Sequence, residues 1–348
     1  MEVTNLNGVE VNPGDLNTQH AALWHSAGVL DLSSRSRLCL AGADRVRFLH
    51  GQVTNDVKSL GVGGGCYAAL ITAKGKMQSD MSIYCLPEEL LLDFEPGLTA
   101  MVSERLEKYV IADDVQIIDV AANYGLLSVQ GPKSESVISA VGIGDELPGR
   151  PFGFVRKGET AFGEIHVINQ PRLGTSGYDL LVATERSGAL KKKLIAAAKS
   201  AGGCECGWAG FETARIEAGI PRFGADMDET TNPLEAGLEE RAISFNKGCY
   251  IGQEVISRIR TYSEVAKALR GLRLADDLKS LPRKGDKLFY DGKEAGFVTS
   301  ATASLRLNAN IALGYVKREV NQLGTELVLR TAEGESRARI VELPFVKG

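Results

Sequence analysis

A change of pattern near residue 271 constrains the fold of this chain more than any other feature. Up to that point, short apolar runs alternate with helical patterns, whereas only short alternating runs follow it. These late runs lie at 287–290, 296–299, 313–316, 327–331 and 337–343. Asp291-Gly292 separates the first two and is typical of a hairpin turn. We therefore expect two domains, at residues 1–265 and 270–348, of which the second is a small β-barrel.

The first 265 residues mix strands with helices, which indicates an α+β fold class. Helices are predicted at 187–200, 207–218 and 253–267 from apolar residues at helical spacing. A strand, a glycine turn and a helix at 37–51 recur at 126–141, which suggests an internal repeat. Asp44 is expected to cap the helix of the first unit. The Gly-x-Gly-x-x-Gly pattern of a dinucleotide-binding fold does not occur, so that fold is not expected.

Cys249 lies in the stretch Asn-Lys-Gly-Cys-Tyr-Ile-Gly-Gln-Glu at 246–254, at the start of the last predicted helix. The Lys247 ammonium and the N–H groups of a helix N-terminus both favour the thiolate form of a cysteine. Gly248 and Gly252 leave the backbone on either side bare, so that a ligand or a partner can approach closely. The alternative is a buried structural cysteine in a strand-to-helix turn.

Charge and composition exclude several classes of protein. The chain has 44 acidic and 40 basic residues, and its net charge of −4 argues against a broad surface for nucleic acid or membrane. No apolar run approaches the length of a membrane span. Residues 1–15 are polar, acidic and free of arginine, unlike a signal or transit peptide. We therefore expect a cytoplasmic protein that has no membrane partner and no stable nucleic-acid partner.

Six cysteines among 348 residues are too few for a disulfide framework. Cys204 and Cys206 form a Cys-x-Cys pair, a spacing that suits a metal ligand. No second pair has a ligand spacing, and the four histidines are scattered along the chain. We therefore predict no metal site.

The stretch around Cys249 resembles the Lys-Gly-Cys-Tyr/Phe-x-Gly-Gln-Glu signature of the YgfZ family. Members of that family bind folate, support iron–sulfur enzymes and are related to the glycine-cleavage T-protein. Stretches at 40–56, 73–80 and 215–238 resemble the same superfamily, so the resemblance covers nearly the whole chain. It implies an α+β T-protein-like folate-binding fold of two interleaved α+β portions with a small C-terminal β-barrel, in a cloverleaf arrangement. It also implies a central cavity that holds tetrahydrofolate.

The resemblance assigns roles to individual residues. Glu217 matches a glutamate that binds the pterin, and a carboxylate can accept two parallel N–H bonds from such a ring. Lys247 falls near a cation that faces the folate, and Asp80 matches the second of two paired aspartates in T-proteins. Arg215, which can compensate the charge of Glu217 at a helix end, joins the predicted folate-binding residues.

Two residues are candidates for chemistry, Cys249 as a reactive thiol and Asp80 as an acid or base. For Asp80, a turn or helix-cap aspartate is the structural alternative. The resemblance implies a tetrahydrofolate-binding protein that supports assembly or repair of iron–sulfur enzymes, with these client proteins as transient partners.

One alternative function is a folate-dependent aminomethyl transferase of the T-protein class. Ser79 stands where T-proteins have the first paired aspartate, which weakens that interpretation. Another alternative is a structural scaffold with an inert Cys249. Whether the protein is an enzyme therefore stays open.

Overall fold

The structure is a computed structural model and describes residues 4–6, 9–11, 13–262 and 264–346. Its contacts divide the chain into two compact units, each assembled from segments that are distant in sequence. Unit 1 comprises Met1–Ile71, Gln78–Phe211 and Arg241–Ile251, and unit 2 comprises Thr72–Met77, Glu212–Glu240 and Gly252–Gly348. The predicted boundary between 265 and 270 stays a prediction, because a compact unit need not fold by itself.

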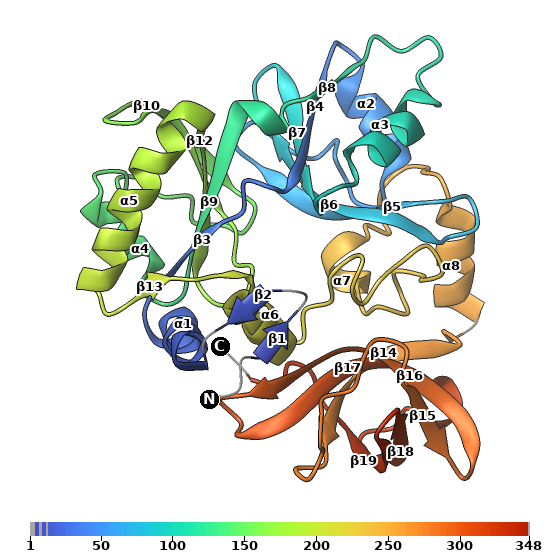
Figure 1. Ribbon diagram of the computed structural model, residues 1–348. Coiled ribbons are helices and arrows are strands. Elements are labelled where there is room, and N and C mark those ends of the chain that lie inside the picture. The colour runs from blue at the N-terminus through green and yellow to red at the C-terminus, as the bar shows by residue number, and fades with distance from the viewer. Residues whose placement is uncertain (1–3, 7–8, 12, 263, 347–348) are drawn as a thin grey trace. The chain divides into compact units, whose positions relative to one another are not determined.

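A six-stranded sheet with helices packed on it forms one part of unit 1 (Figure 1). Its strands, in sheet order, are β10 Phe154–Thr160, β11 Gly163–Asn169, β12 Gly177–Ala183, β9 Tyr124–Gln130, β3 Gly28–Asp31 and β13 Cys204–Glu205. All neighbours run antiparallel except β13, which pairs with β3 in parallel. Helices α4 Ser134–Ala140 and α5 Thr184–Ser200 pack on this sheet and share its apolar core. Helix α1 Pro13–His25 packs against β3 and β13.

A five-stranded sheet with two helices forms a second apolar core in unit 1. Its strands, in sheet order, are β5 Gly65–Ile71, β6 Met77–Cys85, β7 Glu89–Phe94, β4 Ser36–Ala41 and β8 Gln116–Asp119. Helices α2 Arg45–Gln52 and α3 Thr99–Glu107 supply Phe48, Leu49, Val102 and Leu106 to its core. The 3₁₀ turn η1 Ala121–Asn123 follows β8, and β1 Thr4–Leu6 pairs with β2 Val9–Val11.

The predicted repeat of strand, glycine turn and helix is confirmed, as β4–α2 and β9–α4. The chain passes from strand to helix through Gly42 (φ 101°) and Gly131 (φ 121°), where only glycine is unstrained. A Cβ on Gly42 would lie 2.2 Å from the Asp114 carbonyl oxygen, so this turn also needs the space. Asp44 occupies the expected N-cap position of α2, but its side chain makes no capping bond to the helix. The Asp44 carboxylate instead accepts the Asp114 N–H at 3.0 Å.

The C-terminal β-barrel is confirmed and belongs to unit 2 (Figure 1). Its strands, in barrel order, are β14 Lys267–Leu274, β17 Ala309–Lys317, β16 Lys293–Ser304, β15 Lys287–Tyr290, β18 Glu326–Thr331 and β19 Gly334–Val341. Asp291 (φ 48°) and Gly292 (φ 74°) form the predicted hairpin turn, with the left-handed backbone that such turns require. Apolar side chains from all six strands, such as Leu272, Leu288 and Leu329, fill the interior of the barrel.

Helices α6 Trp208–Glu217, α7 Glu239–Ala242 and α8 Gln253–Tyr262, with the 3₁₀ turn η2 Arg318–Val320, complete the regular structure of the described residues. The predicted helix at 253–267 ends early because the barrel strand β14 begins at Lys267. The α+β fold class with a terminal barrel is thus confirmed.

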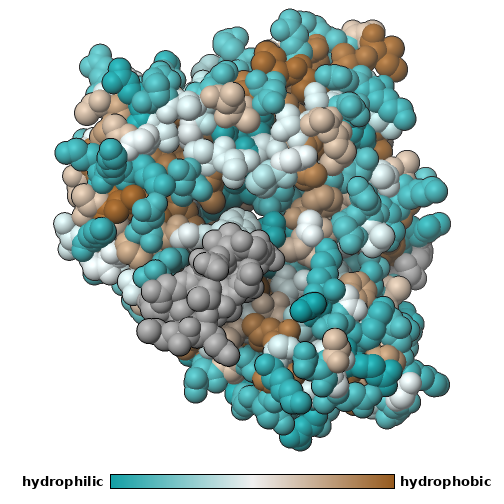
Figure 2. Space-filling model, viewed as in Figure 1, coloured by the Kyte–Doolittle hydropathy of each residue, from teal (hydrophilic) through white to brown (hydrophobic). Residues whose placement is uncertain are grey.

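Apolar side chains gather at the upper edge of the face shown in Figure 2, over α2, α3 and β8 of unit 1. This part of the chain includes the exposed Tyr109, Ile111 and Ile118, and Ile111 is 90% exposed. Within the described part of the chain, we find no helix that combines the length and the apolar content needed to span a membrane.

Candidate functional site

The loop that carries Cys249 is fastened to the end of helix α2. The Lys247 ammonium donates to the carbonyl oxygens of His50 at 2.5 Å, Val53 at 2.7 Å and Asn55 at 2.8 Å. On the other side of the cysteine, the Ile251 N–H donates to the Gly51 carbonyl at 3.1 Å. All of these residues belong to unit 1. Residues 247–251 therefore lie directly over the C-terminal turn of α2.

Lys247 and Cys249 occupy opposite environments. Lys247 is buried, and burial lowers the pKa of its ammonium to about 8, so most of it is still protonated at pH 7. Its three carbonyl partners show that the charge holds the loop, and the predicted contact of Lys247 with folate stays a prediction. Cys249 is exposed, which contradicts the alternative of a buried structural cysteine. The predicted activation of this thiol by Lys247 and by a helix N-terminus stays a prediction.

His50, which sequence reasoning did not single out, lies beneath the cysteine loop. Its side chain is 7% exposed. The Nδ1 atom accepts the Lys58 N–H at 3.3 Å and lies 3.3 Å from an oxygen of the Asp56 carboxylate. The Nε2 atom faces Gly248, where a Cβ would stand 3.7 Å away. Burial, and next the Lys247 ammonium, lower the pKa of His50, so its ring is neutral at pH 7.

Asp80 lies in strand β6, so the alternative of a turn or helix-cap aspartate is wrong. The carboxylate is buried, and the Tyr67 hydroxyl of β5 donates to it at 2.6 Å. Burial, and next the charge of Glu95, raise the pKa of Asp80 to about 6. Burial and the neighbouring Asp80 raise the pKa of Tyr67 well above its ordinary value. Asp80 can therefore exchange a proton near neutral pH while Tyr67 stays protonated.

Glu217 is fully buried at the end of helix α6. Its Oε1 accepts the Ser304 hydroxyl of β16 at 2.6 Å, and its backbone carbonyl accepts the Val346 N–H at 3.2 Å. These contacts lie within unit 2 and fix the carboxylate at the wall of the barrel. The predicted contact of Glu217 with the pterin stays a prediction.

Arg215 lies in a buried ion cluster of unit 2. Its guanidinium donates to Asp226 and Glu212, and to the Ser300 hydroxyl at 2.7 Å. Asp226 in turn accepts the Thr299 hydroxyl at 2.5 Å, so the cluster joins α6 to strand β16. Burial lowers the pKa of Arg215, but the charges of Asp226 and Glu212 outweigh burial and raise it. The predicted contact of Arg215 with folate stays a prediction.

The predicted site residues fall into two groups. Asp80, Lys247 and Cys249 belong to unit 1, whereas Arg215 and Glu217 belong to unit 2. A common hollow for Cys249 and Glu217 stays a prediction.

The Cys-x-Cys pair begins in strand β13. The sulfur atoms of Cys204 and Cys206 are 3.9 Å apart. Within 4–6, 9–11, 13–262 and 264–346, no group of three or more His, Cys, Asp or Glu side chains is placed to hold a metal ion.

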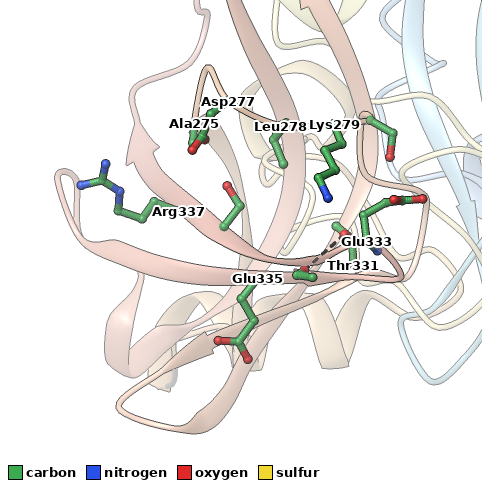
Figure 3. Close-up of a pocket in the computed structure, with 11 residues that line it drawn as sticks. Ala275, Asp277, Leu278, Lys279, Thr331, Glu333, Glu335 and Arg337 are labelled. Carbon is green, nitrogen blue, oxygen red and sulfur yellow. Dashed lines mark hydrogen bonds between the residues drawn. The ribbon is translucent and has the colours of Figure 1, made fainter.

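A hollow of about 380 Å³ lies at the β18–β19 end of the barrel (Figure 3). Its lining comes from 275, 277–280, 331 and 333–337, which include none of the residues predicted from the sequence. Charges of both signs surround it, and in Figure 3 the ends of Arg337 and Glu335 point away from one another. We assign no ligand to this hollow.

Residues 13–247 match the GCVT N-terminal domain, and residues 267–347 match the glycine cleavage T-protein C-terminal barrel domain. An aminomethyltransferase of Halalkalibacterium halodurans is 30% identical over 94% of this chain and 89% of its own length. A putative transferase of Arabidopsis thaliana, described as chloroplastic, is 32% identical over 91% of this chain and 71% of its own length.

Among solved structures, the glycine cleavage system aminomethyltransferase T of Bartonella henselae has the same fold. Its TM-score is 0.84 at 22% identity, over 95% of this chain and 90% of that chain. The fold, the terminal barrel and the match to both domains agree along nearly the whole sequence. The chain therefore belongs to the glycine-cleavage T-protein superfamily.

Proposed function

We propose that this protein binds a reduced folate, tetrahydrofolate, and transfers a one-carbon group between that folate and a small amine. The pair of Asp80 and Tyr67 carries this proposal. A transfer of this kind moves a proton on or off a nitrogen atom, and a group that exchanges protons near pH 7 suits that task. Asp80 has a pKa of about 6, and the Tyr67 hydroxyl fixes the direction of its carboxylate. The aminomethyltransferases among its relatives support the same interpretation.

The folate would be held by groups that the protein already orients. Glu217 offers a carboxylate fixed by Ser304, and a carboxylate suits the paired N–H donors of a 2-aminopteridine edge. Ser79 stands beside Asp80 and donates its own hydroxyl to the Asp80 carbonyl at 3.0 Å. One carboxyl would therefore carry the proton transfer at this position of the strand.

Two measurements test this function in order. Equilibrium titration with tetrahydrofolate should give saturable binding in the micromolar range, and Glu217→Gln should weaken it about tenfold or more. Steady-state transfer of a one-carbon unit should then fail in Asp80→Asn while folate binding persists. Absence of saturable binding would end the folate proposal, and full transfer activity in Asp80→Asn would end the proposed role of Asp80.

A second candidate function is the support of iron–sulfur enzymes by a folate-binding protein of the YgfZ type. It rests on the exposed Cys249 inside the stretch at 246–254 that resembles the YgfZ signature. We would then expect iron–sulfur client proteins as transient partners and a cytoplasmic location. Cells that carry Cys249→Ser should lose activity of iron–sulfur enzymes, whereas Cys204→Ser should not. Equal activities in both strains would count against this candidate.

A further inference from the structure

An imidazole with one unused nitrogen atom lies directly beneath the loop that carries Cys249. His50 is more than nine-tenths buried. Its Nδ1 atom has partners, but among the residues that the structure describes its Nε2 atom has none. That atom faces Gly248, the residue that precedes Cys249. Nε2 is therefore available to a group of the loop above it.

The position of Cys249 over His50 is fixed from both sides. Lys247 holds the His50 carbonyl itself at 2.5 Å, and Ile251 holds the carbonyl of Gly51, the next residue of α2. Only three residues lie between these two attachments. Gly248 has no side chain that could shield the ring, so Nε2 is open to the segment that carries Cys249.

We propose that Cys249, His50 and Asp56 form a nucleophilic thiol site in which His50 accepts the thiol proton and Asp56 positions the imidazole. Its substrates would be electrophilic carbon or sulfur groups that reach the exposed thiol. The proposal does not depend on the proposed folate function, because the thiol reaction is measured without folate.

The two contacts of Nδ1 decide whether His50 can act. When Nδ1 accepts the Lys58 N–H, the neutral ring carries its proton on Nε2 and cannot accept another there. When Nδ1 carries the proton, it donates to the Asp56 carboxylate, and the lone pair of Nε2 is available to the thiol. Asp56 is therefore a positioning residue that selects the active tautomer, as a carboxylate does in a catalytic triad.

The charged groups near the ring affect the two forms of His50 differently. Lys247 and Lys58 oppose the imidazolium form, whereas Asp56 favours it. The ring is consequently neutral at pH 7 and can take up a proton when a thiolate forms beside it. With iodoacetamide as electrophile, the Cys249 sulfur bonds to the methylene carbon and iodide leaves. The thiol proton passes to Nε2 and then to water.

The test follows the rate of Cys249 carboxamidomethylation by mass spectrometry of its peptide, from pH 6 to pH 9. At pH 7, His50→Gln should react about tenfold to a hundredfold more slowly than the natural protein. Added imidazole should restore part of the rate, because the site is open to solvent. A purely structural role of His50 would give no such rescue.

Asp56→Asn should also slow the reaction and move its pH profile, since the neutral amide oxygen that replaces the carboxylate holds the Nδ1 proton less strongly. The amide oxygen of this variant can still accept the Ser59 N–H that Asp56 accepts at 3.2 Å, so the fold should persist. Asp44→Asn, at the opposite end of α2, is the matched control and should react at the natural rate. All variants should react equally in guanidinium chloride. Natural rates and pH profiles in both His50→Gln and Asp56→Asn would overturn the proposal.

Discussion

Lys247 and Cys249 are two positions apart, yet the fold buries one and exposes the other. The lysine ammonium reaches three carbonyl oxygens, one in the last turn of helix α2 and two in the residues that follow the helix. A sequence shows the lysine beside the cysteine but not these acceptors, because they come from residues 50–55. The sequence therefore predicted an effect of Lys247 on the thiol, which stays a prediction, but it could not show that Lys247 also holds the loop.

Asp80 is a second residue whose surroundings cannot be seen in the sequence, and it leads to a prediction on pH. Its neighbours Tyr67 and Glu95 come from strands β5 and the end of β7, so the chain order hides the raised pKa. The folded protein holds a proton on Asp80 up to about pH 6, whereas the unfolded chain releases it near 3.8. Between these values the native state binds more protons, so the free energy of unfolding falls as pH rises.

Asp80→Asn removes the free-energy cost of ionising a buried carboxyl group. This cost amounts to about 3 kcal/mol above pH 6, for a difference of about two pH units between the two pKa values. Relative to the natural protein, the variant should gain on the order of 1–3 kcal/mol in free energy of unfolding between pH 4 and pH 8. Urea denaturation at the two pH values measures this gain. Asp145→Asn, at an exposed position, should show no such difference. Parallel pH dependence in Asp80→Asn and the natural protein would contradict the raised pKa.

At the scale of elements, helix α6 is joined to the barrel by a buried cluster of charges. The guanidinium of Arg215 meets the Asp226 carboxylate, and both side chains are almost fully buried. A buried ion pair adds little net stability, but the loss of one partner leaves the other charge buried without compensation. Arg215 thus has a structural role within unit 2.

A comparison of a single variant with a double variant tests this account. Arg215→Met should lower the free energy of unfolding by about 3–5 kcal/mol. Arg215→Met combined with Asp226→Asn should be more stable than the single variant, since the neutral amide can still accept the Thr299 hydroxyl and carries no charge. Arg330→Met, which breaks a pair whose side chains are 55% and 56% exposed, should cost under about 1 kcal/mol. A double variant less stable than Arg215→Met would disprove the account.

At the scale of the whole molecule, the sequence predicted elements better than their partners. The turn at Asp291-Gly292 and the glycine turn of each repeat were predictable because local backbone geometry requires those residues. The order of the strands and the place of His50 beneath Cys249 were not, since both depend on contacts between residues that are distant in the chain. The short strand β13 was missed because its two residues pair only through β3.

The predicted boundary near 265–270 can be tested through the two faces of the barrel. Its interior is closed and apolar, so a chain limited to 264–348 should fold and unfold cooperatively. Its outer face is also apolar where Leu269, Leu313 and Tyr315 pack with Ile216 of α6, and this face is bare in the shortened chain. The shortened chain should therefore be less stable than the full protein and bind a hydrophobic dye.

Leu313 lies on that outer face, and Leu329 lies in the interior. Leu313→Thr should cost about 2–5 kcal/mol in the full chain, where the side chain is fully buried, but close to nothing in the shortened one. Leu329→Thr should destabilise both, because its surroundings are the same in each. Circular dichroism during urea denaturation measures all four variants. If 264–348 does not fold, or if Leu313→Thr costs the same in both chains, the barrel is not the independent domain that the sequence predicts.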